Sequence, residues 1–256
     1  MLVIRAEQME VFEQVSRRRF EDEMMAHSKA FSPRLCEVIG DEPLHAAARS
    51  AIARAERYGF TNRGPIRLFI ELMFLCGSAF DTDPQYAAAG QFLRASGDQM
   101  HRAQQLHEWH NDYLERVSGP GAVNVYNALS ELLSFARLPL TIDQEDLTGG
   151  LLREMKRIFP TKAAFVGEAG MTAIIDESTA EAERYGFEGV RPAVLLAVLK
   201  FALGHGCTDS PLYPWIVQVL QGPEIFSPAA RAAHLEDKAI TWLEDVVAGN
   251  REGSQS

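Results

Sequence analysis

The chain has little cysteine and no long hydrophobic run, and both shortages narrow the class of protein it can be. Its three cysteines, Cys36, Cys76 and Cys207, form no CxxC pair, and an odd number of isolated thiols predicts reduced, buried residues in a cytoplasmic protein. The most apolar stretch, PIRLFIELMFLCG at 65–77, is shorter than the roughly 20 residues of a membrane span. The opening sequence lacks the basic start and apolar run of a signal peptide. We therefore expect a cytoplasmic protein that does not enter a membrane.

Basic residues are scarce, with 25 Lys and Arg against 35 Asp and Glu and a formal net charge of −10. Such a chain repels the phosphate backbone of DNA or RNA on average, so the sequence predicts no nucleic-acid partner. A basic surface on another protein suits the charge better. The alternative is that the negative net charge only keeps the protein soluble.

The motifs of common enzymes are missing as well, since the chain contains no GxSxG, no Walker A sequence and no HExxH. In HEWH, His107 and His110 lie one helical turn apart, but the second histidine comes one residue too early for HExxH. His205, Cys207 and Asp209 in GHGCTDS would form a Cys–His nucleophile only if folding aligned them, and a variable loop is the simpler explanation. We expect no catalytic residues, no cofactor and no metal site.

What the sequence does contain is an internal repeat. The hexapeptide AERYGF occurs at 55–60 and again, 127 positions later, at 182–187. At this offset the alignment runs without a gap over 24–84, and it matches prolines and glycines in particular. A repeat of this kind indicates duplicated structural units. We interpret the chain as a tandem duplication with copies at about 2–117 and 138–248.

The matching positions are mostly helix ends. Gly59 and Gly186 can adopt the left-handed conformation that closes a helix, and the phenylalanine after each suits the apolar contact of a Schellman cap. Asp83 and Ser210 each precede a proline, as an N-cap residue often does. The repeat therefore predicts where helices start and stop, and it does not by itself indicate a reaction.

Apolar residues recur with helical spacing along almost the whole chain, which predicts an all-α fold of two diverged helical bundles packed together, with a bridging helix. The apolar segments 65–77 and 191–204 are expected to be the central buried helices of the two copies. The predicted regions are helical repeat 1 at 1–117, a bridging helix and linker at 118–137, helical repeat 2 at 138–248 and a disordered tail at 249–256. The predicted helices are 5–31, 42–58, 65–77, 84–95, 99–117, 122–137, 143–158, 168–185, 191–204, 212–221 and 227–248.

Five residues in the FDTDP and TDSPLYPW segments are candidates for contact with a partner. Asp81 and Asp83 form a pair of acids in the first copy, and Asp209 is the acid retained in the second. Tyr213 and Trp215 follow it at the start of a helix, and these residue types are common in interface hot spots. Helix capping by the acids and burial of the aromatic rings in the core are the alternatives.

The opening MLVIRAEQM, the AERYGF segment and the stretch LMFLCGSAFDTDP together resemble a loosely defined family of small helical bacterial proteins. As that resemblance implies, such proteins carry one unit of this kind and are associated with type VI secretion clusters, beside toxic effectors and their adaptor chaperones. The resemblance covers about residues 2–95, and the second copy lacks the FD-x-DP motif. It implies a helical fold and supplies no catalytic residues.

The resemblance implies two functions. A non-catalytic accessory, or co-chaperone, would hold an effector or its adaptor chaperone before secretion, and two diverged copies would give it two contact faces. An immunity protein would instead bind and neutralise a toxin, and an acidic chain suits a basic toxin. We favour the accessory, and an enzyme with an unrecognised helical site is a third alternative. The sequence sets neither the partner's identity nor the oligomeric state.

Overall fold

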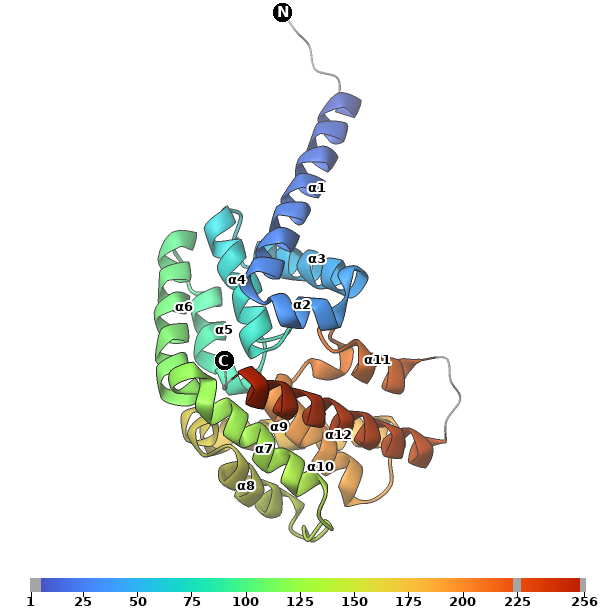
Figure 1. Cartoon of the computed structure of the whole chain (residues 1–256). Coiled ribbons are helices and arrows are strands. Elements are labelled where there is room, and N and C mark those ends of the chain that lie inside the picture. The colour runs from blue at the N-terminus through green and yellow to red at the C-terminus, as the bar shows by residue number, and fades with distance from the viewer. Residues whose placement is uncertain (1–5, 223–226, 254–256) are drawn as a thin grey trace, which may run out of the picture.

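The computed structural model describes residues 6–222 and 227–253, with the side chains of 6–13, 34 and 249–253 left out of the description. Within these residues every regular element is a helix, which confirms the predicted all-α class (Figure 1). None of the described helices is long and apolar enough to cross a membrane.

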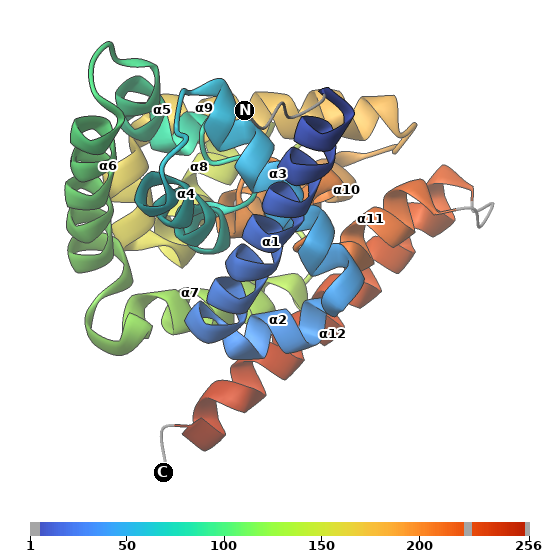
Figure 2. The same cartoon turned by 90° about the horizontal axis from the view of Figure 1, so that it is seen from above.

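The first half contains α1 (Ala6–Phe31), α2 (Pro33–Ile39), α3 (Asp41–Arg57), α4 (Arg63–Cys76), the 3₁₀ turn η1 (Pro84–Tyr86), α5 (Ala87–Arg94), α6 (Gln99–Tyr113) and the π-helical turn η2 (Leu114–Ser118). A 3₁₀ turn, η3 (Pro120–Ala122), and α7 (Val123–Ala136) follow. The second half contains α8 (Leu147–Ile158), α9 (Pro160–Arg184), α10 (Val190–Leu203), the 3₁₀ turn η4 (Cys207–Asp209), α11 (Pro214–Gln221) and α12 (Pro228–Gly253). The first half lies above the second in Figure 1, and in Figure 2, seen from above, the first half is nearer the viewer.

The two halves have the same order of helices. The central helices α4 and α10 have the same length and lie 127 positions apart, and so do α5 and α11. α8 matches the last part of α1, while α9 matches α2 and α3 joined into one helix that kinks at Gly167. A duplicated unit would produce this correspondence.

The repeated helix stop has the geometry that the sequence predicts. Gly59 and Gly186 have φ of 72° and 69°. The Phe60 N–H donates to the Ala55 carbonyl at 3.0 Å, and the Phe187 N–H makes the equivalent bond at 2.9 Å. These are the bonds of Schellman caps, with the following phenylalanine buried in both halves.

Two short helical segments are not predicted from the sequence, namely α2 and the first turns of α9. Each begins with a proline, Pro33 or Pro160, and ends at a glycine with positive φ, Gly40 at 82° or Gly167 at 75°. Segments this short hold too few apolar residues to show a helical period, so their prolines and glycines indicate loops instead.

Some predicted boundaries need correction. α6 ends at Tyr113, after which the backbone widens into the π-helical turn η2. α8 begins at Leu147, later than the predicted start at 143. α12 continues to Gly253, so the predicted disordered tail is helical over 249–253, and its last three residues lie outside the described part.

The main hydrophobic core crosses the boundary between the halves. One cluster of buried side chains joins Met24 of α1 and Phe69 of α4 to Leu199 of α10 and Leu235 of α12. A second cluster lies between α7, α8, α9 and α10. The two halves therefore share their main core, and the second half has a further core that it forms with α7.

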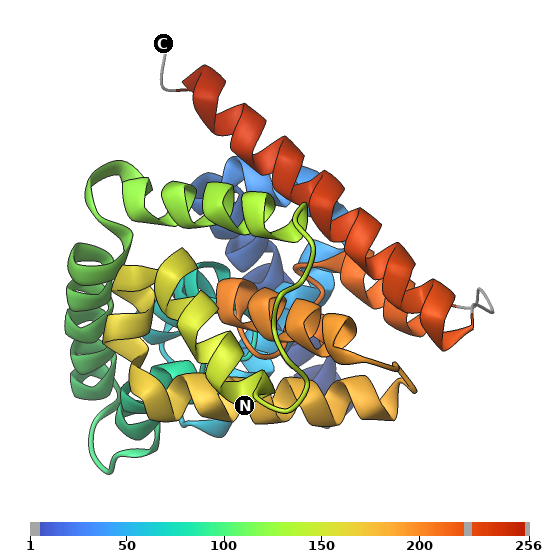
Figure 3. The same ribbon diagram turned by 90° about the horizontal axis from the view of Figure 1, so that it is seen from below.

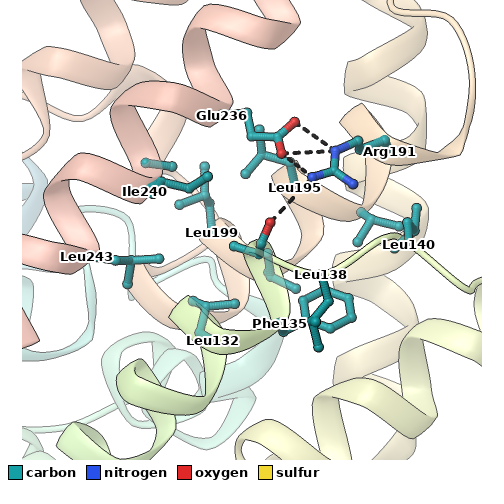
Figure 4. A pocket seen from close by; sticks show the side chains of 14 residues that line it. Leu132, Phe135, Leu138, Leu140, Arg191, Leu195, Leu199, Glu236, Ile240 and Leu243 are labelled. Carbon is teal, nitrogen blue, oxygen red and sulfur yellow. Dashed lines mark hydrogen bonds and ion pairs between the residues drawn. The ribbon is translucent and has the colours of Figure 1, made fainter.

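The predicted bridging segment, 118–137, contains η3 and α7. α7 packs chiefly along α12 and also touches α8, both in the second half, so it covers that half more than it seals the joint (Figure 3). Arg191 of α10 ties this arrangement together, because its guanidinium donates to Glu236 of α12 and, at 3.3 Å, to the Ala136 carbonyl at the end of α7. Beneath this bridge lies a small apolar cavity of about 40 Å³ (Figure 4).

Candidate functional site

The two halves touch at a pair of glycines, where the central helices α4 and α10 end. A Cβ on Gly77 would lie 2.6 Å from the Leu203 carbonyl oxygen, and a Cβ on Gly204 would lie 2.7 Å from the Cys76 carbonyl oxygen. The contact is reciprocal, as at a local twofold axis. The backbones can approach this closely only because both positions lack a side chain.

A cleft of about 350 Å³ opens beside this contact, and its wall comes from both halves. Several lining residues occupy equivalent positions of the two copies: Ser50 and Glu177, Arg54 and Glu181, Met73 and Lys200, Ser78 and His205. We call it the junction cleft. Each pair combines different side chains, so the cleft lies where the copies have diverged in charge.

Asp81 and Asp83, predicted as partner contacts, lie at this junction but are only 3% and 2% exposed. Asp81 accepts hydrogen bonds from the Arg54 Nε at 3.1 Å and from the Tyr58 hydroxyl at 3.0 Å. The prediction of both acids as surface contacts is therefore corrected, since their carboxylates are used inside the protein.

Asp83 joins the halves directly. Its carboxylate accepts from the Gln85 N–H at 2.9 Å, which is the expected N-cap bond, and from the His205 N–H at 2.8 Å. Burial raises the pKa of this carboxyl above its ordinary value, although the two backbone bonds act in the opposite direction. Ser210 has the matching cap bond in the second half, from the Leu212 N–H at 3.1 Å.

Lys200 is the buried cation of the junction cleft. Its Nζ lies 2.6 Å from a carboxylate oxygen of Glu181, which is also buried, and 3.6 Å from one of Glu177. The first copy has Met73 and Arg54 at the positions of Lys200 and Glu181. This ion pair therefore belongs to the second copy alone, and removing one partner would leave a buried charge uncompensated.

His205 links a hydroxyl to a carboxylate across the cleft. Its Nε2 lies 3.1 Å from the Thr82 Oγ1, and its Nδ1 lies 3.2 Å from the nearer Glu177 oxygen. The Thr82 hydroxyl also donates to the Ala79 carbonyl at 3.2 Å. That bond occupies the only hydroxyl proton, so in this geometry the chain of groups ties two loops together rather than activating Thr82.

Cys207 does not pair with His205 as a nucleophile. The thiol is buried, and burial raises its pKa to about 12, which keeps it protonated at neutral pH. The imidazole of His205 is meanwhile engaged with Thr82 and Glu177. The loop interpretation of GHGCTDS fits this arrangement.

The remaining predicted contact residues divide into buried and exposed. Tyr213 is buried in the core shared by the halves, so its prediction as a contact is corrected. Asp209 is exposed at the rim of the junction cleft, where the Gln221 amide donates to it. Trp215 is half-buried and stacks on Trp242 at 6.2 Å between ring centroids. Contact with a partner stays a prediction for Asp209 and Trp215.

The histidines of HEWH point in different directions. His110 is buried, and its pKa falls to about 4, mainly through burial and then through the nearby His107. His107 is exposed and lies 3.2 Å from the Asn111 amide. Among the described residues, no group of three or more His, Cys, Asp and Glu is placed to hold a metal ion.

Comparison of the chain with protein-family models, with curated proteins and with solved structures yields no significant match in any of the three. Sequence reasoning missed Lys200 and Glu181, which could have been found because they differ in charge from Met73 and Arg54 at the equivalent positions of the first copy.

Proposed function

We propose that the protein is a non-catalytic, cytoplasmic accessory of type VI secretion, which binds an effector outside its toxic region or binds that effector's adaptor chaperone. The resemblance of residues 2–95 to helical proteins of type VI secretion clusters supports this context. The observation that carries a binding role is the arm formed by the first part of α1, which projects from the body of the molecule (Figure 1).

The arm has no helical counterpart in the second copy, where residues 141–146 form no helix. Residues 20–31 of α1 match α8, whereas the arm precedes them, so the duplicated core does not need it. Residues 14–19 are all exposed, and Val15 is 59% exposed. A helix without packing on either side is only marginally stable in water. A second protein that packs on the arm would supply the missing contacts.

The charge of the arm indicates the kind of surface that it fits. Arg17, Arg18 and Arg19 form an exposed basic run on an otherwise acidic protein. Arg17 lies near Glu21 and Glu56, at 3.7 and 3.8 Å. Arg18 and Arg19 have no ion-pair partner among the described side chains and would attract an acidic partner surface, with Val15 providing an apolar contact beside them.

The test is a pull-down from the cells in which the protein is made, with the partner identified by mass spectrometry. We expect the wild type to recover an effector or adaptor and Arg18→Glu/Arg19→Glu to lose it, with the melting temperature unchanged. Arg49→Glu/Arg153→Glu is the matched control, because it reverses two exposed arginines on α3 and α8. Equal recovery by both double variants would reject the arm as the binding element.

An immunity protein is the second candidate, and the formal net charge of −10 is the observation that favours it. Many basic enzymes, nucleases among them, present a positive active site that an acidic protein can cover. The discriminating measurement is the activity of the captured toxin. Blocked activity in the complex supports immunity, whereas an active toxin bound through its non-toxic region supports the accessory.

A further inference from the structure

A second hollow lies on the side of the molecule formed by α4, η2, α7 and the start of α9. It encloses about 480 Å³, a size typical of small-molecule sites. Its wall is mainly apolar, with Phe74 and Phe159 inside and Leu75 and Val125 partly exposed at the mouth. We call it the lysine groove, because Lys162 is the one charged residue among the described residues that line it.

A buried lysine such as Lys162 is unusual in an apolar wall. The side chain is buried, 7% exposed, and its Nζ donates to the Phe201 carbonyl. It also lies over two rings, 5.0 Å from the centroid of Phe201 and 5.5 Å from that of Tyr86. None of the ion pairs among the described residues includes Lys162, although the buried carboxylate of Asp83 interacts with its charge at longer range.

The fold itself does not require this cation. The equivalent position of the first copy is Leu35, which packs against the core at the same place in the repeat. The bond to Phe201 caps the end of α10, but it uses only one of the three ammonium hydrogens. The other two ammonium hydrogens have no acceptor among the hydrogen bonds of the described residues, and the side chain lines the groove.

The part of the wall next to the start of α9 has a backbone geometry that costs free energy. It includes the π-helical turn η2 and Ala122, which has a φ of 60° and is the non-glycine residue with positive φ in the described part of the chain. The Val117 carbonyl holds this wall in place by accepting from the Asn124 amide at 3.1 Å and from the Thr161 hydroxyl at 3.0 Å. Such geometry is found disproportionately at binding sites.

We propose that the lysine groove binds a small carboxylic acid with an apolar body, the class represented by medium-chain fatty acids. The carboxylate would pair with the Lys162 ammonium, and the apolar body would lie along Phe74, Val125 and Leu129. An anion of this shape would give the ammonium a directly bonded carboxylate and would also fill the apolar space. This site is distinct from the arm of α1, and the proposal does not depend on the role of that arm.

The test is calorimetric titration of the full chain with decanoate and with decan-1-ol, which has the same apolar body and no charge. We expect decanoate to bind about tenfold more tightly or better, as a charge-assisted bond predicts. Lys162→Met should reduce the affinity for decanoate to that for the alcohol. Lys156→Met, which removes an exposed lysine on α8, is the control and should leave both affinities unchanged.

Val125→Trp tests the groove without touching a buried residue, because the ring would close the mouth, and both ligands should then bind weakly. Equal affinity of the wild type for decanoate and decan-1-ol overturns the proposal, and so does decanoate binding that survives Val125→Trp.

A short apolar peptide with a free carboxyl end is the remaining probe. Binding of this peptide without any binding of decanoate would also overturn the proposal, since the groove would then serve a protein terminus.

Discussion

The repeated unit requires glycine at two kinds of position. Gly59 and Gly186 need only their left-handed backbone, because the nearest atom to an added Cβ is 3.5 Å away at Gly59 and 3.4 Å away at Gly186. Gly77 and Gly204 need both a positive φ, 100° and 95°, and the space that a Cβ would fill with the backbone of the other half. The second kind should therefore tolerate substitution less.

We predict a graded loss of stability in three glycine-to-alanine variants. Gly59→Ala should lower the free energy of unfolding by about 1–2 kcal/mol through its φ alone. Gly77→Ala should lower it by more than about 2 kcal/mol, since the clash adds to the backbone strain. Gly64→Ala in α4, with open space around it, should be neutral or slightly stabilising. Urea denaturation measures all three, and equal losses at Gly59 and Gly77 would contradict the close contact.

Lys162 gives the protein a pH dependence of stability that can be isolated. Burial lowers the pKa of its ammonium from 10.5 to about 8, although Asp83 and Cys76 act in the opposite direction. The unfolded chain then binds more protons than the folded chain between about pH 8 and 10.5, so this group makes stability rise with pH over that window. The full effect corresponds to about 3 kcal/mol.

We predict that wild type gains stability relative to Lys162→Met as the pH is raised from 7 to 10, because the variant has no buried cation to neutralise. Thermal or urea unfolding of both proteins at each pH gives the difference, which cancels the other groups that titrate in this range. A difference that stays constant between pH 7 and 10 would mean that Lys162 keeps its ordinary pKa.

At the scale of elements, the seam between α7, α10 and α12 is imperfectly packed. The cavity in Figure 4 is lined by leucines and by Val198, beneath the bridge of Arg191 to Glu236. Empty apolar space forfeits contacts that a larger side chain could make. Ala197, the neighbour of Val198 on α10, is fully buried and does not line this cavity.

We predict opposite effects of two substitutions on α10. Val198→Ile should raise the free energy of unfolding by up to about 0.8 kcal/mol, because the added methylene group enters the cavity. Ala197→Val should lower it by about 1–3 kcal/mol by overpacking a filled region. Chemical denaturation distinguishes the two. Loss of stability in both variants would show that the cavity does not accept the methylene group.

At the scale of the molecule, the shared core and the glycine contact make the halves interdependent. The buried cluster that begins at Met24 continues to Leu235, and Asp83 bonds across the junction to His205. Neither half therefore buries its central helix alone.

We predict a single cooperative transition in differential scanning calorimetry of the full chain, with the calorimetric and van't Hoff enthalpies in agreement. The isolated first copy, residues 1–117, should fail to show a cooperative transition, because its core would lose Leu199 and the other side chains from the second half. Two separate transitions in the full chain would contradict a shared core.

Local chemistry determined the parts of this protein that the sequence predicts well. The left-handed glycines at 59 and 186 and the N-caps at Asp83 and Ser210 depend on residues within one turn, so their signals stand next to one another in the chain. The all-α class follows from the same local periodicity. The helix α2 was not predicted, because its 7 residues are too few to show a helical spacing of apolar side chains.

The tertiary structure alone decided which charged residues became internal. Asp81 and Asp83 read as exposed acids in the sequence, yet folding brings Arg54 to the first and the backbone of His205 to the second. Nothing near Lys162 in the sequence marks it as buried, and only the packing of Tyr86 in η1 and Phe201 in α10 around it makes it a buried cation beside an apolar groove. Burial and charge compensation arise from residues far apart in the chain, and the local pattern does not record them.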